Sequence, residues 1–190
     1  MKAGIKSILT AGTLAGMLAI TAFAPAPRNL NLGKESRLWL DGTSTVRSFK
    51  CAATKVNVTA LGEPTAEPAE IVKSASLTVP VAQLDCGNKT MNEHMRKALK
   101  AEQFTEIAWT MTSYQVQGAN VTIEGKLTIA GKENPIELKG TGSVDNGVIR
   151  FKGSKQFKMT EYGVKPPSLM LGTMKVGDPI TVSFDLVLSD

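Results

Sequence analysis

The chain of 190 residues has few of the residues that build catalytic and metal sites. It holds one histidine, His94, and two cysteines, Cys51 and Cys86. Neither a nucleophile elbow nor a pair of zinc-binding histidines occurs, and a metal pair at the cysteines would need further ligands. We therefore expect no enzyme, no catalytic residue, no metal site and no cofactor.

Runs of charge are also missing. The net charge of +5 is modest, and lysines and glutamates are scattered along the chain. Such a pattern is typical of a solvated surface, so we expect no nucleic-acid partner. Aromatic residues are scarce as well, with six Phe, two Trp and two Tyr. A core built from this chain must depend on aliphatic and small side chains.

The N-terminus has the pattern of a signal peptide over residues 1–24. Lys2 and Lys6 precede an uncharged run at 8–22, and residues 22–24 (AFA) offer a cleavage site with small residues. The exact cut is left open, as is an uncleaved anchor, although the run is short for a span of about 20 residues. We expect a protein that is exported to the periplasm or secreted.

Export changes the meaning of the two cysteines. In an oxidising compartment an even count favours a disulfide, so we expect Cys51 and Cys86 to pair. Each ends a strand-like run, so a bridge would tie two segments of one wall. Two free buried thiols remain the alternative.

Most of the remaining chain alternates between apolar and polar residues, the pattern of strands with one buried face. Residues 25–34 are rich in Pro, Asn and Gly and are predicted to be a flexible lead-in to one domain at 35–190. A hairpin turn is predicted at 145–147 (DNG) and a connection at 131–134. The predicted strands cover 38–40, 46–60, 71–84, 107–111, 121–129, 136–144, 149–157 and 180–188.

About eight antiparallel strands predict an all-β fold, either a barrel or a sandwich. The length of the strands favours a single eight-stranded barrel, which is wide enough to be filled by side chains or to hold one small ligand. The sequence does not decide between a filled interior and one that holds a ligand. Pro80 cannot donate to a ladder and is expected at an edge or a bulge. A homodimer through such an edge is left open.

One amphipathic helix interrupts the strands. Thr90 and Glu93 form a capping box, which predicts Thr90 as the N-cap. His94 borders the apolar face and is expected to bond to a neighbour or to water rather than to act in catalysis. We expect the helix to serve as a lid over something apolar. Its apolar face would carry Met91, Met95, Ala98 and Leu99.

An irregular segment at 159–167 (MTEYGVKPP) leads into further methionines at 170 and 174. Methionine makes adaptable apolar surfaces. Two interpretations are open: a hydrophobic plug at one end of the barrel, or a portal that contacts a flexible apolar ligand.

Five segments in this order carry a resemblance to a known family. They are 42–46 (GTSTV), the helix at 91–99 (MNEHMRKAL), 125–131 (GKLTIAG), 159–167 (MTEYGVKPP) and 171–176 (LGTMKV). With them the chain resembles the YceI-like family of exported bacterial proteins over residues 36–188. The resemblance implies a lipocalin-like barrel with an elongated apolar cavity, which holds a polyisoprenoid chain in some members, and no established enzymatic activity. Glu133 and Asn134 depart from the family, which usually has Thr and Lys there.

We therefore expect a lipid-binding module that carries or sequesters a polyisoprenoid or another long-chain lipid. The alternative is a structural or stress-response protein with a packed core that acts through a surface contact. Lys165 or Lys175 could meet an anionic head group. The residues expected to line a cavity are Trp39, Phe49, Met91, Met95, Ile107, Trp109, Ile123, Leu127, Phe157, Tyr162 and Phe184.

Overall fold

A computed structural model describes residues 26–63, 71–169 and 173–190. The predicted signal peptide at 1–24 lies outside these described residues. None of the helices within them is long and apolar enough to cross a membrane. The strands are β1 (Arg28–Leu32), β2 (Arg37–Ser44), β3 (Ser48–Ala53), β4 (Asn57–Gly62), β5 (Val72–Pro80), β6 (Leu84–Asp85), β7 (Glu106–Gln117), β8 (Asn120–Ile129), β9 (Lys132–Asp145), β10 (Val148–Lys158), β11 (Ser168–Leu169) and β12 (Met174–Ser189). The helices are α1 (Lys89–Ala98) and the 3-10 turns η2 (Val81–Gln83) and η3 (Met159–Tyr162).

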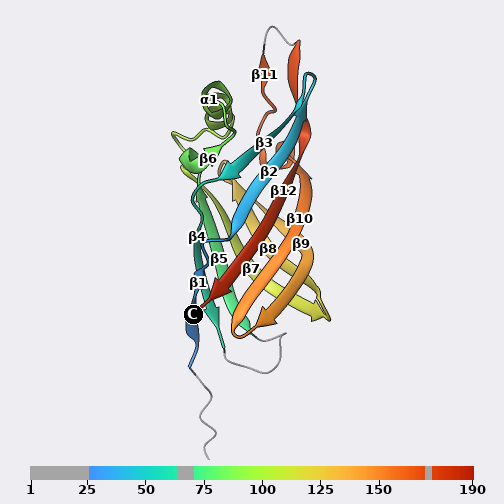
Figure 1. The fold of residues 1–190 in the computed structure, drawn as a ribbon. Coiled ribbons are helices and arrows are strands. Elements are labelled where there is room, and N and C mark those ends of the chain that lie inside the picture. The colour runs from blue at the N-terminus through green and yellow to red at the C-terminus, as the bar shows by residue number, and fades with distance from the viewer. Residues whose placement is uncertain (1–25, 64–70, 170–172) are drawn as a thin grey trace, which may run out of the picture.

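These strands form one closed antiparallel barrel (Figure 1). Neighbours follow the order β1-β4-β5-β7-β8-β9-β10-β12, and β12 pairs with β1 again. Closure removes the free edges that an open sheet would expose. The prediction of an all-β, eight-stranded barrel is confirmed.

Three of the eight barrel strands are interrupted. Both β1 and β2 run antiparallel along β12, with Asn31 opposite Ser189 and Arg37 opposite Asp185, so together they form one long strand broken at 33–36. The same holds for β3 and β4, and for β5 and β6 around η2. Each long strand therefore bends and still spans the barrel.

The two-residue turns of the hairpins follow from their sequences. Asn146 and Gly147 both have positive φ, 48° and 81°, as a two-residue turn between β9 and β10 requires. The predicted turn at 145–147 is confirmed. Ala130 and Gly131, with φ of 49° and 79°, join β8 to β9 in the same way, so the predicted connection at 131–134 is too long.

Two strand predictions need correction. The flexible lead-in at 25–34 is wrong for Arg28–Leu32, which forms β1, because Leu30 is buried between β4 and β12 with 3% of its surface exposed. Pro80 is the last residue of β5, an interior strand. It lies beyond the last pair with β4, Asn57 opposite Thr78, so the missing N–H interrupts no bond on that side.

Helix α1 lies at one end of the barrel, beside β6 (Figure 1). It begins at Lys89, and its N-cap is Asn88, whose Oδ1 accepts a hydrogen bond from the Met91 amide at 3.0 Å. The prediction of Thr90 as the N-cap is wrong. Asn is among the strongest N-cap residues and ranks above Thr, so the earlier signal sets the helix start.

The buried core sits at this same end. Phe157 and Tyr162 pack edge to face, with ring centroids 5.2 Å apart, and Val164 lies beside them. Ala98 and Leu99 at the end of α1 pack against this cluster. The segment at 159–164 therefore packs as a hydrophobic plug at this end of the barrel, in line with the first of its two interpretations, and its contact with a ligand stays a prediction.

Candidate functional site: an apolar barrel cavity

Below the plug the barrel contains a cavity of about 720 Å³. The volume falls within the range of small-molecule sites, roughly 300–1,000 Å³. Its wall extends from Met91 on α1 to Leu188 near the end of β12, so the cavity is elongated along the barrel. The described lining residues include no aspartate and no glutamate. The site is suited to an apolar ligand.

The apolar side chains of the wall are not packed to the density of a filled core. Leu77, Ile107 and Leu127 come from neighbouring strands, face inward and are only half-buried. In a barrel filled by side chains such residues would be fully buried. An interior filled by side chains, which was one of the two alternatives, is found only in the cluster around Phe157 and Tyr162.

All eleven residues expected to line the cavity border it, and ten of them are taken first. They come from β3, α1, β7, β8, β10, η3 and β12, so segments far apart in sequence meet around one space. Two of the ten, Phe157 and Tyr162, belong to the plug at its end. Contact of any of these residues with a ligand remains a prediction. The ten are Phe49, Met91, Met95, Ile107, Trp109, Ile123, Leu127, Phe157, Tyr162 and Phe184.

Trp39 differs from the expectation for its ring. It contributes to the wall through its place on β2, but its neighbours across the sheet are Ser183 and Ala52, on the outer face. The exposed Lys50 ammonium lies 5.3 Å from the centroid of its ring. The inward neighbours on β2 are Leu38 and Leu40, so the strand register turns the Trp39 ring toward the outer face, and its contact with a ligand stays a prediction.

The two lysines proposed for a head group lie outside the cavity wall. Lys165 and Lys175 are exposed, whereas Val164 and Val176 beside them border the cavity. Their contact with a head group remains a prediction.

Helix α1 covers one end of the cavity without being buried itself. Met91, Met95 and Ala98 border the cavity, yet no residue of the helix is fully buried. The apolar face of the helix therefore borders the cavity, and only its end at Ala98 and Leu99 packs against the core cluster.

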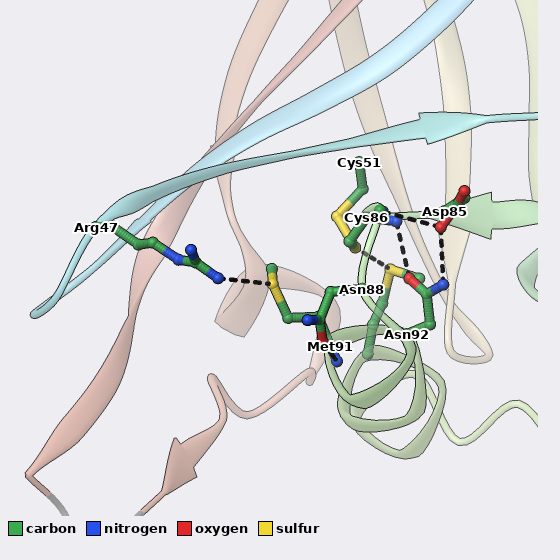
Figure 2. The surroundings of a disulfide bond; sticks show 9 residues. Arg47, Cys51, Asp85, Cys86, Asn88, Met91 and Asn92 are labelled. Carbon is green, nitrogen blue, oxygen red and sulfur yellow. Dashed lines mark hydrogen bonds between the residues drawn. A yellow bond between two sulfur atoms is a disulfide. The ribbon is translucent and has the colours of Figure 1, made fainter.

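Asn92 fixes this helix to the barrel (Figure 2). Its Oδ1 accepts a hydrogen bond from the Cys86 amide, and its Nδ2 donates to Oδ1 of Asp85, both at 2.8 Å. The same carboxylate oxygen accepts the Gly87 amide at 2.9 Å. The bond from Asn92, with that from Gly87, stabilises the charged form and lowers the pKa of Asp85.

The disulfide between Cys51 and Cys86 confirms the predicted pairing. It joins β3 to the residue that follows β6, and Cys51 is 2% exposed. Figure 2 shows the bridge beside the helix, and Sγ of Cys86 lies 3.8 Å from Sδ of Met95. The bridge therefore supports the lid as well as the wall.

The hairpin between β2 and β3 approaches the same face of the helix one turn earlier, at Met91. Nη2 of Arg47 in its turn lies 4.0 Å from Sδ of Met91. Arg47 is exposed and also borders the cavity. It was missed in the sequence because nothing local distinguishes a turn arginine from other surface charges.

The plug is held by polar contacts around η3. The amide and Oγ1 of Thr160 donate to the Asp178 carboxylate at 2.9 and 2.6 Å. These two bonds lower the pKa of Asp178. Nδ2 of Asn134 donates to the Glu161 carbonyl oxygen at 2.9 Å, so this departure from the family pattern ties the β8–β9 hairpin to the plug.

His94 borders the cavity but forms no hydrogen bond or ion pair with any residue that the structure describes. The expected bond of its ring to a neighbour or to water stays a prediction. Across the described ranges, no three His, Cys, Asp or Glu side chains gather where they could hold a metal ion.

Comparisons with known proteins agree with this architecture. The family profile of the YceI-like domain matches residues 34–188. Burkholderia cenocepacia BcnA is 21% identical with a TM-score of 0.71, and the match covers 83% of this chain and 99% of that one. The Campylobacter jejuni YCEI protein is 19% identical with a TM-score of 0.61, over 73% and 83% of the two chains.

A third similar structure is a polyisoprenoid binding domain from Saccharophagus degradans implicated in plant cell wall breakdown. It is 12% identical with a TM-score of 0.62, over 85% of this chain and 97% of that one. A comparison with curated proteins gives no match. At these identities the likenesses establish the barrel fold.

Proposed function

The chain belongs to the YceI-like family, and we propose that it is an exported lipid-binding protein. It holds one long apolar ligand of the polyisoprenoid type in its barrel, for carriage or sequestration, and catalyses no reaction. One observation carries the proposal: the elongated cavity of about 720 Å³ has an apolar, half-buried wall, and none of the described residues that line it is a carboxylate.

The energetics favour a long chain. Removing an apolar chain from water is worth about 0.8 kcal/mol for each buried CH₂ group. A ligand that fills the cavity also buries the half-exposed side chains of the wall, such as Leu77 and Ile107. Affinity then grows with the length of the buried chain.

The similar domain from Saccharophagus degradans supports the ligand class, because it is described as polyisoprenoid binding and shares the fold. Export is supported by the pattern of residues 1–24 and by the disulfide between Cys51 and Cys86, since such bonds persist in oxidising compartments. The packed-core alternative is less well supported, because the cavity leaves the barrel unfilled.

A substitution that narrows the middle of the cavity tests the proposal. Ile123 faces inward between Tyr114 and Leu138, while Thr122 beside it faces outward. We expect Ile123→Trp to abolish displacement of an apolar fluorescent dye by a long-chain isoprenoid alcohol, and Thr122→Trp to leave it unchanged. Equal displacement from the wild type and both variants would place the ligand outside the barrel and refute the proposal.

A further inference from the structure

A lysine interrupts the apolar inner face of β10. Ile149, Phe151, Gly153 and Phe157 face inward at two-residue spacing, and Lys155 occupies the remaining position of the series. It borders the cavity and is half-buried, whereas Ser154 and Gln156 on either side are exposed.

The surroundings of this lysine are apolar. Lys155 lies opposite Val182 on β12, and Val182 lies opposite Leu40 on β2. Both of these neighbours border the cavity. Its ammonium group is therefore carried on the inner wall of the barrel, away from the outer charges of β10.

Within the described part of the chain, Lys155 forms no hydrogen bond or ion pair. Of the other two cationic residues of the wall, Arg150 makes two hydrogen bonds to the Asp185 carboxylate, at 2.8 and 2.7 Å, and Arg47 is exposed to solvent in the turn between β2 and β3. No described lining residue is acidic. The charge of Lys155 is thus uncompensated by the protein.

We propose that Lys155 binds the anionic head group of the lipid and anchors it inside the barrel. This inference rests on the proposed lipid-binding function and adds a preference to it: anionic amphiphiles over neutral ones of equal length. A half-buried cation loses hydration and gains most from an anionic oxygen, because charge-assisted bonds are stronger than neutral ones. The exposed Lys165 and Lys175 are well hydrated and gain less from such a contact.

The test compares two ligands with the same tail. Binding of farnesyl phosphate and of farnesol is measured by calorimetry, with inorganic phosphate as the head group alone. Lys155→Met removes the charge and keeps the length of the side chain. Lys152→Met makes the same change on the exposed outer face of the same strand, and Lys155→Arg keeps the charge.

We expect wild type to bind farnesyl phosphate more tightly than farnesol. Lys155→Met should weaken farnesyl phosphate roughly 10- to 100-fold, the range expected for a charged hydrogen bond, and leave farnesol unchanged or tighter. Lys152→Met should behave as wild type, and Lys155→Arg should keep most of the preference. Inorganic phosphate should not bind measurably.

Several results would overturn the inference. If wild type binds both farnesyl ligands equally, or if Lys152→Met and Lys155→Met have the same effect, the head group is not held by Lys155, although lipid binding stands. Tight binding of inorganic phosphate alone would assign the lysine to a free anion. If neither farnesyl ligand binds, the lipid-binding function fails as well. If Lys155→Met does not fold, equal binding of farnesyl phosphate and farnesol by wild type still overturns the inference.

Discussion

Removing the disulfide should lower the stability of the barrel by about 4 kcal/mol. The bond links Cys51 and Cys86, which are 35 positions apart. In the chain-entropy description a loop of this length removes about 13 cal/mol/K from the unfolded state, or about 4 kcal/mol at 25 °C. The double variant Cys51→Ala/Cys86→Ala is the appropriate change, because a single substitution would leave a free thiol beside a buried site.

Urea unfolding followed by far-UV circular dichroism measures the change, with wild type in a reducing agent as a second form without the bridge. We expect both forms to unfold at clearly lower urea than oxidised wild type. The lid should loosen too, because Cys86 contacts Met95 and its amide donates to Asn92. A loss below about 1 kcal/mol for the double variant would contradict this reasoning, because the bridge would then restrict the unfolded chain much less than its loop length requires.

Three further predictions follow from individual contacts. Asn92→Ala should lower the free energy of unfolding in urea by about 1–3 kcal/mol, because the Cys86 amide and the Asp85 carboxylate lose their hydrogen bonds to Asn92. Substitution of the exposed neighbour, Glu93→Ala, should lower it little, and equal losses would argue against the role of Asn92. The folded pKa of Asp178 lies below its usual 3.8, so the stability that this carboxylate contributes is present above about pH 4 and is lost as the pH falls through the folded pKa. The free energy of unfolding of Asp178→Asn should therefore fall less steeply with acid than that of wild type, and an unchanged pH dependence would refute this. Trp109 borders the cavity, whereas the strand register places the ring of Trp39 on the outer face beside Lys50. Ligand should therefore still change the fluorescence of Trp39→Phe and should leave that of Trp109→Phe nearly constant; the reverse pattern would contradict both placements.

The barrel was predictable from local alternation. The runs at 149–157 and 180–188 place every second residue on the inner face, and β10 and β12 pair in that register from Ile149 to Lys158. Two-residue periodicity reports which face is apolar, whether that face meets a packed core or a cavity. For the same reason it could not decide between a filled and an empty interior.

The interruptions of the long strands depend on distant partners. Residues 33–36 break the strand between β1 and β2, and the two pieces are aligned only because both pair with β12 at the far end of the chain. Local composition there predicts a loop, and so β1 was assigned to the flexible lead-in. Its burial comes from contacts that no local window contains.

The site residues were predicted by hydrophobicity, and two differences from the structure follow from that choice. Residues 38–40 are all apolar, so alternation cannot tell which of them faces inward, and Trp39 was taken as one of the inward apolar residues. Lys155 lies within a clear inward series, but a lysine was taken as solvated. Its position within the series, rather than its residue type, indicates that Lys155 faces inward.

Native mass spectrometry of the protein purified from its own cell envelope tests the central claim most directly. We expect wild type to retain one tightly bound lipid under mild extraction, and Ile123→Trp to carry none while Thr122→Trp carries the same lipid. Wild type that is free of lipid, or a lipid that persists in Ile123→Trp, would contradict the account of the barrel as a lipid-binding cavity.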